Sequence, residues 1–177
     1  MKAYQFFQRS CALVLTLLVA GVASAQQSQT DSQGFKVIVP ANISITAPDA
    51  VELTHDQSDN NQTFPAQSWI VKGNLLNGVN VSFATASPFV HTSGNFKRDA
   101  GLALALGTTQ GPATWTITTP TDATNYGNSV DSASVAASSN GVGRADLDLT
   151  VTFVTEQFGI FAAGDYNLTV VGTVAGN

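Results

Sequence analysis

Alternation of apolar and polar side chains with a period of two residues is the feature that most constrains this chain. The clearest stretch runs from Arg144 to Val154, and its apolar positions are Ala145, Leu147, Leu149, Val151 and Phe153. Successive side chains of an extended backbone point to opposite faces, whereas a helix would scatter these residues around its circumference. The pattern therefore predicts a half-buried β-strand.

The same alternation recurs along the chain, separated by segments rich in Gly, Pro, Asn and Asp. The other clear strands are expected at 79–84, 102–106, 114–118 and 166–174. Weaker candidates are 35–39, 42–46, 50–54, 67–72 and 129–137, the last with a bulge or a split because Val130 and Val135 differ in parity. Turn chemistry predicts loops at 55–66, 119–128 and 138–143. Together these segments predict an all-β protein, an antiparallel immunoglobulin-like β-sandwich of about nine or ten strands.

The first 25 residues have the pattern of an export signal. Lys2 and Arg9 precede an apolar run at 11–22, and Ala23-Ser24-Ala25 supplies the small residues of a cleavage site. The run is shorter than the roughly twenty residues that span a bilayer. We therefore expect a signal peptide at 1–25, a flexible polar leader at 26–33, and one domain at 34–177 without a membrane span, ordered from near Gly34.

Charge and cysteine content narrow the function classes. Cleavage after Ala25 leaves five basic and twelve acidic side chains, a net charge of −7, which argues against binding to nucleic acid or to anionic membranes. The one cysteine, Cys11, lies within the signal, so disulfides, thiolate metal ligands and a cysteine nucleophile are not expected in the mature chain. We expect a secreted protein that is periplasmic, extracellular or at the cell surface.

The C-terminal segment carries a resemblance to known domains. Ala163-Gly164-Asp165-Tyr166, followed by Leu168 and Val170, resembles the approach to a late strand in immunoglobulin-like domains, where a tyrosine hydroxyl bonds back to loop backbone. The opening FKVIVPANISITAP, the central short strands and the ending AGDYNLTVVGTV are together similar in layout to secreted bacterial subunits of the spore coat protein U and fimbrial type, which usually carry cysteines. The resemblance implies a sandwich, and a structural role for Tyr166.

The histidines, His55 and His91, are the candidates for acid–base chemistry. His55 lies in a polar loop beside Asp56, where we expect a solvated contact, and His91 is expected at a sheet edge. Neither belongs to a G-x-S-x-G or H-E-x-x-H motif. We therefore expect no catalytic residues, no cofactor and no enzyme.

Carboxylates and aromatic rings are the remaining candidates for binding. Asp56, Asp59, Asn60 and Asn61 lack the spacing of a calcium loop, and Asp146 and Asp148 share one strand face, so we expect solvated acidic surface and no metal site. Trp69 and Trp115 share parity with core positions, whereas Tyr126 is expected on an exposed loop, as a single ring that does not make a glycan site. Sequons occur at Asn42, Asn61, Asn80 and Asn167.

Two functions of different classes remain open. The first is a non-catalytic structural or adhesive subunit of the cell surface or extracellular matrix, of the pilus or coat kind, that joins itself or other surface subunits by edge-strand pairing. Residues 35–39 are the candidate donor strand, although pairing within their own domain is the simpler expectation. The second is a secreted module that binds a glycan or another ligand; the sequence singles out no ligand-binding residue.

Overall fold

A computed structural model describes residues 28–177, and the predicted signal peptide at 1–25, with Cys11, lies outside the described residues. The chain divides into a first unit that ends at Ile38 and a second unit, Val39–Asn177. In the first unit, residues 28–38 form no strand and are exposed. The second unit contains all thirteen strands of the described chain.

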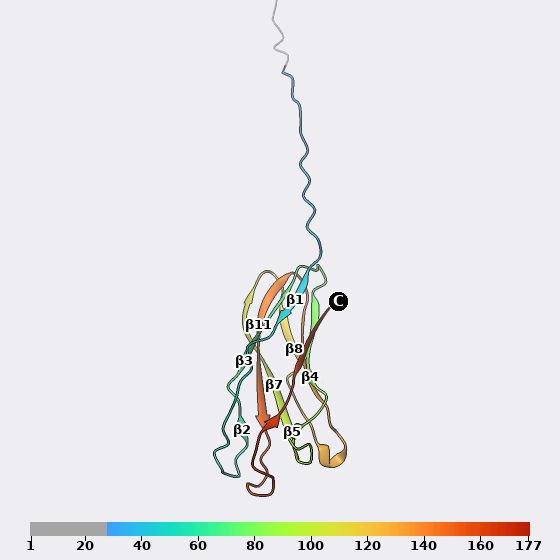
Figure 1. Ribbon diagram of the computed structural model, residues 1–177. Coiled ribbons are helices and arrows are strands. Elements are labelled where there is room, and N and C mark those ends of the chain that lie inside the picture. The colour runs from blue at the N-terminus through green and yellow to red at the C-terminus, as the bar shows by residue number, and fades with distance from the viewer. Residues whose placement is uncertain (1–27) are drawn as a thin grey trace, which may run out of the picture. The chain divides into compact units, whose positions relative to one another are not determined.

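Two antiparallel sheets form the body of the second unit. The larger sheet has the strand order β1 (Ile43–Thr46), β3 (Gln67–Gly73), β11 (Gly143–Phe153), β7 (Ala100–Gln110) and β9 (Thr121–Ala123), and β2 (Gln62–Thr63) also pairs with β11. The second sheet has the order β13 (Val171–Gly176), β4 (Val79–Thr85), β10 (Ala133–Ser139) and β8 (Trp115–Thr119). Figure 1 shows the long strands β3, β7, β11 and β4 running along the molecule between two ends made of loops.

A third, small sheet lies at one end. Its order is β12 (Tyr166–Asn167), β5 (Phe89–His91) and β6 (Lys97–Arg98), all antiparallel. Figure 1 shows β5 and β2 at the lower end, together with the loop that follows β11, whereas β1 and the C-terminus lie at the upper end. We call the lower end, where the rings of Phe89, Phe153 and Phe161 pack together, the aromatic end.

The predicted alternation produces the core between the two large sheets. The apolar positions of β3, β7 and β11 face those of β4, β8 and β10, and fully buried residues include Val71, Phe83, Val135 and Leu147. Burial of such side chains contributes roughly 25 cal/mol per Å² of apolar surface removed from water. The prediction of an all-β antiparallel sandwich is confirmed.

A bulge in β7 shows where simple alternation fails. Leu147 pairs with Leu106, but Ala145 pairs with Thr109, so β7 carries one extra residue opposite Asp146. A Cβ on Gly107 would lie 2.9 Å from the Asp146 carbonyl oxygen, so the close approach requires glycine here. The bulge bends β7, and Leu106, expected in the core, is 40% exposed.

Several strand predictions are wrong in detail. Residues 35–39 and 50–54 form no strand, and the first strand begins at Ile43 instead of near Gly34. In the final segment, at 166–174, the side chains alternate between the two faces as predicted. The segment is nevertheless divided into two strands, β12 and β13, which join different sheets. Five strands have only two or three residues, and β2 and β9 lie in segments predicted as loops, which is why the structure exceeds nine or ten strands. Such short pairings carry too few residues to show a period.

Candidate functional site

The aromatic end holds both histidines and a second apolar cluster. Phe89, Ala100 and Phe153 are buried there, and the partly buried side chains packed on them are Phe64, Val151, Phe161, Tyr166 and Leu168. The rings meet mostly edge to face, as between Phe153 and Phe161, whose centroids are 5.7 Å apart. Strands β5, β7, β11 and β12 carry most of these residues, whereas His55 and Phe161 come from the loops before β2 and after β11. The site is therefore assembled from segments distant in sequence.

His55 is half-buried, and the expectation of a solvated loop residue is wrong. Its ring stacks on Phe158 at 5.4 Å between centroids and meets the edges of Phe153 and Phe161. Asp56 is the expected neighbour, with a carboxylate oxygen 3.8 Å from Nδ1, but it is an additional contact beside this aromatic packing. The packing arises because the connection between β11 and β12 folds over the ring, which no local pattern could reveal.

The hydrogen bonds of His55 settle its tautomer and its chemistry. The backbone N–H of Gln57 donates to Nδ1 at 3.0 Å, so a neutral ring carries its proton on Nε2. Nε2 is 2.9 Å from the Thr155 hydroxyl oxygen, and that hydroxyl in turn donates to the carbonyl of Asn60 at 2.8 Å. Because the proton of Nε2 points at Thr155, His55 does not act as a base toward this hydroxyl.

His91 lies at the end of the central strand of the small sheet, because β5 pairs with both β6 and β12; the expectation of an edge position is wrong. Its Nδ1 accepts the backbone N–H of Ser93 at 3.1 Å, and its Nε2 is 3.2 Å from the carbonyl oxygen of Ala163. A Cβ on Gly164 would clash with Nε2 of the His91 ring. Glycine at this position therefore lets the chain pass against the ring.

Arg98 is a residue of this end that sequence reasoning missed. Its side chain is 4% exposed, donates to the carbonyls of Val154 at 3.0 Å and Thr155 at 2.6 Å, and pairs with Glu156 at 2.9 Å. The guanidinium also lies 5.2 Å from the centre of the Phe161 ring. Arg98 thus fixes the start of the β11–β12 connection, and nothing in its local sequence distinguishes it from a surface arginine.

Tyr166 has the structural role expected from the resemblance. Its hydroxyl donates to the carbonyl of Ala162 at 3.1 Å, so the predicted bond back to loop backbone is confirmed. Burial raises the pKa of the phenol, because the phenolate would lose hydration. The neutral phenol closes the far side of the same connection that Arg98 holds at its start.

The polar loop at 55–62 is satisfied by hydrogen bonds within the loop and with the segment that follows β11. Asp56 accepts from the Ser58 hydroxyl and backbone and from Gln62, and these bonds lower the pKa of the carboxyl. Asp59 accepts from the Phe158 backbone at 2.7 Å, and Asn61 from the Thr155 backbone at 3.1 Å. Within residues 28–177 no three His, Cys, Asp or Glu side chains are grouped to hold a metal ion.

The carboxylates of β11 are likewise engaged locally. Asp146 accepts from the hydroxyl of Thr108, at the β7 bulge, and from Arg144 at 3.0 Å. The Thr108 bond, followed by the Arg144 bond, lowers the pKa of Asp146. Asp148 lies against the backbone of Gly107 in the same bulge. These groups hold the register of β7 on β11 and do not converge on an empty site.

The aromatic candidates divide between core and surface differently from expectation. Trp115 is a core residue, 6% exposed, as predicted, and Trp69 packs edge to face on Phe83 at the border of the core. Tyr126, expected on an exposed loop, is half-buried in a short 3-10 turn at Tyr126–Asn128, and its backbone N–H donates to Asp99. The more exposed rings at this end are Phe96 and Phe158, 41% and 42% exposed.

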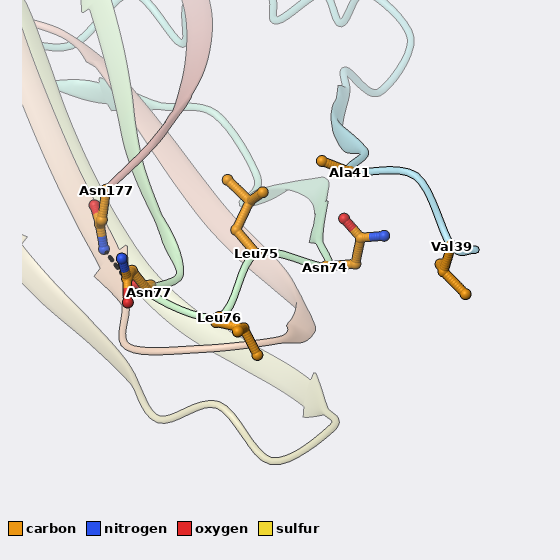
Figure 2. A pocket seen from close by; sticks show the side chains of 7 residues that line it. All are labelled: Val39, Ala41, Asn74, Leu75, Leu76, Asn77 and Asn177. Carbon is orange, nitrogen blue, oxygen red and sulfur yellow. Dashed lines mark hydrogen bonds between the residues drawn. The ribbon is translucent and has the colours of Figure 1, made fainter. Parts of the chain in front are cut away.

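The opposite end of the second unit carries a shallow depression. Figure 2 shows Val39 and Ala41 on one side of it, and Asn77 and Asn177 on the other. The Asn177 side chain donates to the Asn77 carbonyl at 2.8 Å, and Asn74 bonds to the backbone of Pro40 and Asn42. The amide side chains of Asn74 and Asn177 are thus engaged with neighbouring backbone and do not converge on a ligand.

The four sequon asparagines, Asn42, Asn61, Asn80 and Asn167, are all exposed. Among residues 28–177, no helix has the length and apolar character that crossing a membrane requires. No protein-family model, no curated protein and no solved structure matches the chain.

Proposed function

We propose that the protein is an exported, non-catalytic β-sandwich of immunoglobulin-like type that serves as a structural or adhesive subunit of the cell surface or extracellular matrix. Copies of the chain join by strand pairing, as in a pilus or coat. The proposal takes residues 35–39 as the donor strand. The proposal assigns no catalytic role to the aromatic end. There the His55 imidazole bonds to the Thr155 hydroxyl, which in turn bonds to backbone.

The exposure of residues 35–39 is the observation that carries the proposal. Phe35, Val37, Ile38 and Val39 are 87%, 86%, 76% and 76% exposed and belong to no strand. An apolar segment with β-branched residues gains by pairing with a sheet edge that buries one of its faces. A second copy of the chain supplies such edges.

Strand β13 is the most suitable acceptor among the edges. It lies at the border of its sheet, pairs with β4 alone, and has six residues without a charge or a proline. Natural edge strands are usually protected by charge, proline or brevity. The outward-facing Val171, 60% exposed, adds apolar surface that an incoming Val37 or Val39 would cover.

Concentration-dependent assembly of the chain from residue 26 tests this proposal. Sedimentation velocity and electron microscopy should detect fibres or oligomers, which are lost when residues 34–39 are deleted. Deletion of the polar residues 28–33, which has the same length, is the matched control and should leave assembly intact. A chain that stays monomeric at high concentration, or assembly that survives the 34–39 deletion, would contradict the proposal.

The exposed rings of Phe96 and Phe158 favour a second candidate, a glycan- or ligand-binding module. Aromatic faces stack on sugars, and the two rings belong to loops of one end. A glycan array with Phe158→Ala separates the candidates, with Tyr126→Ala as the comparison because Tyr126 is half-buried. Reproducible binding lost in the Phe158 variant, in a chain that does not assemble, would favour this function.

A further inference from the structure

The two histidines of the chain use the same arrangement of hydrogen bonds at two places. In each, Nδ1 accepts the backbone N–H two residues further on, Gln57 for His55 at 3.0 Å and Ser93 for His91 at 3.1 Å. In each, Nε2 then carries the ring proton and points to the β11–β12 connection, at Thr155 Oγ1 or at the Ala163 carbonyl. The connection, residues 154–165, is thus held near both of its ends by a neutral imidazole.

The connection covers apolar surface. Phe161 packs on Phe153 and Tyr166, and Phe158 stacks on His55. Release of the connection would therefore uncover Phe153 and the buried cluster beneath it. Phe158 and Ile160 are 42% and 55% exposed, so the connection itself is only partly covered.

We propose that His55 and His91 form a pH-sensitive clamp that holds the β11–β12 connection closed most firmly while both rings are neutral. A protonated imidazole has N–H groups at both nitrogens, so Nδ1 can no longer accept the N–H of Gln57 or Ser93. Two donors would then face each other, and the turn and the ring must separate. Histidine is the side chain whose charge changes between about pH 5 and pH 8.

Backbone conformation around His55 adds to the clamp. Gln57 has φ +64°, a left-handed conformation that is unfavourable for a residue other than glycine. The bond from its N–H to Nδ1 supports that conformation, as the side chain of asparagine does in an Asx turn. Protonation removes this support, so the strained turn is expected to relax together with the ring.

The charged neighbours make the two histidines unequal. The carboxylate of Asp56 lies 3.8 Å from His55 Nδ1, and Asp59 and Glu156 lie on the two segments that meet there, Glu156 being paired with Arg98. Asp56 attracts a protonated Nδ1, and turning toward it takes Nε2 away from Thr155.

Around His91 the ionisable groups are Lys97 and Arg98 on β6, Asp165 on the connection and Tyr166 on β12. The Ser93 hydroxyl oxygen, 2.8 Å from Nδ1, offers a protonated ring an acceptor without a large movement. We therefore expect His55 to contribute the larger part of the pH response.

Hydrogen–deuterium exchange of the chain from residue 26, corrected for intrinsic exchange rates, tests the clamp. Between about pH 7.5 and about pH 5, opening of amides 156–163 should increase about tenfold, while amides of β4 and β11 stay unchanged. The matched variant is His55→Asn with His91→Asn, because an asparagine oxygen accepts the same backbone N–H without titrating. In this double variant the opening should change less than about twofold over the range.

The single variants and the ring nitrogens complete the test. His55→Asn should remove most of the pH dependence, and His91→Asn the smaller part. Nitrogen chemical shifts of the wild-type imidazoles at neutral pH should show a proton on Nε2 and none on Nδ1, a measurement that does not depend on the variants folding. The clamp is overturned by pH-independent exchange in the wild type, by pH dependence that persists in the double variant, or by a protonated Nδ1.

Discussion

The middle of the sandwich and its aromatic end bury apolar side chains by different means. In the middle, strands of two sheets face each other and thirteen buried residues form one cluster. At the end, only three residues are buried in the cluster, and the segments over it are held by polar side chains bonded to backbone. The middle depends on periodicity, whereas the end depends on individual hydrogen bonds.

The difference teaches where the fold tolerates change. In a sheet, backbone groups pair with the neighbouring strand whatever the side chains are. The packing of the strands is therefore specified by many residues, each of which contributes a small part. The β11–β12 connection lacks such a ladder and relies on individual side chains, which are Arg98, Tyr166, the two histidines, and Asp59 and Asn61 of the facing loop. We therefore expect substitutions in the middle to change global stability, and substitutions at the end to act mainly on the connection.

The largest effect is expected from Leu147→Ala, in the middle. Leu147 is fully buried, and its removal leaves a cavity between two sheets, so the free energy of unfolding should fall by about 3–5 kcal/mol. Leu106→Ala is the control, because Leu106 pairs with Leu147 across β7 and β11 but is 40% exposed. It should cost less than about 1 kcal/mol. Equal losses in chemical denaturation would show that the bulge does not expose Leu106.

Arg98→Met should have the next largest effect. The change keeps the length of the side chain but leaves the carbonyls of Val154 and Thr155 without their donor, at a cost of about 2–4 kcal/mol. Hydrogen exchange should locate the loss in residues 154–165, with β4 and β10 less affected. A uniform loss across both sheets would contradict the division between middle and end.

Tyr166→Phe should cost about 1 kcal/mol near neutral pH, because one hydrogen bond to the Ala162 carbonyl is lost while the ring stays. The pKa of Tyr166 is raised from 10.0 by burial, so its contribution is present below that pH and is lost as the pH rises through the folded-state pKa. The wild type should therefore lose its advantage over the variant in denaturation series extended above about pH 10. A constant difference at all pH values would contradict this role.

The contrast between the middle of the sandwich and its aromatic end also explains which features could be predicted from the sequence. The alternation at 144–154 predicts β11 and its buried face correctly, because one residue after another obeys the same rule. Tyr166 was also predictable, since its position before a strand is a recurring motif. Leu106 was not, because the bulge at Gly107 depends on a close approach to β11 that the local sequence does not encode.

The aromatic end escaped sequence reasoning for a related reason. His55 lies 100 residues from Thr155, and Arg98 lies 57 from it, so neither contact leaves a local pattern. From its local sequence, a histidine in a polar loop is expected to be solvated. Only the three-dimensional structure shows that the β11–β12 connection covers His55. Long-range contacts of single side chains are thus the part of the fold that periodicity does not predict.

The smallest effect is expected from Glu156→Gln, and it sharpens the comparison within the aromatic end. Glu156 is paired with Arg98 at 2.9 Å but its side chain is 56% exposed, so water and salt screen the pair and its loss should cost about 0.5 kcal/mol or less. Arg98 keeps its two carbonyl acceptors in this variant. Denaturation at low and high salt should therefore show a difference that is small and vanishes with salt. A loss as large as that of Arg98→Met would mean that the ion pair, and not the carbonyl bonds, holds the connection.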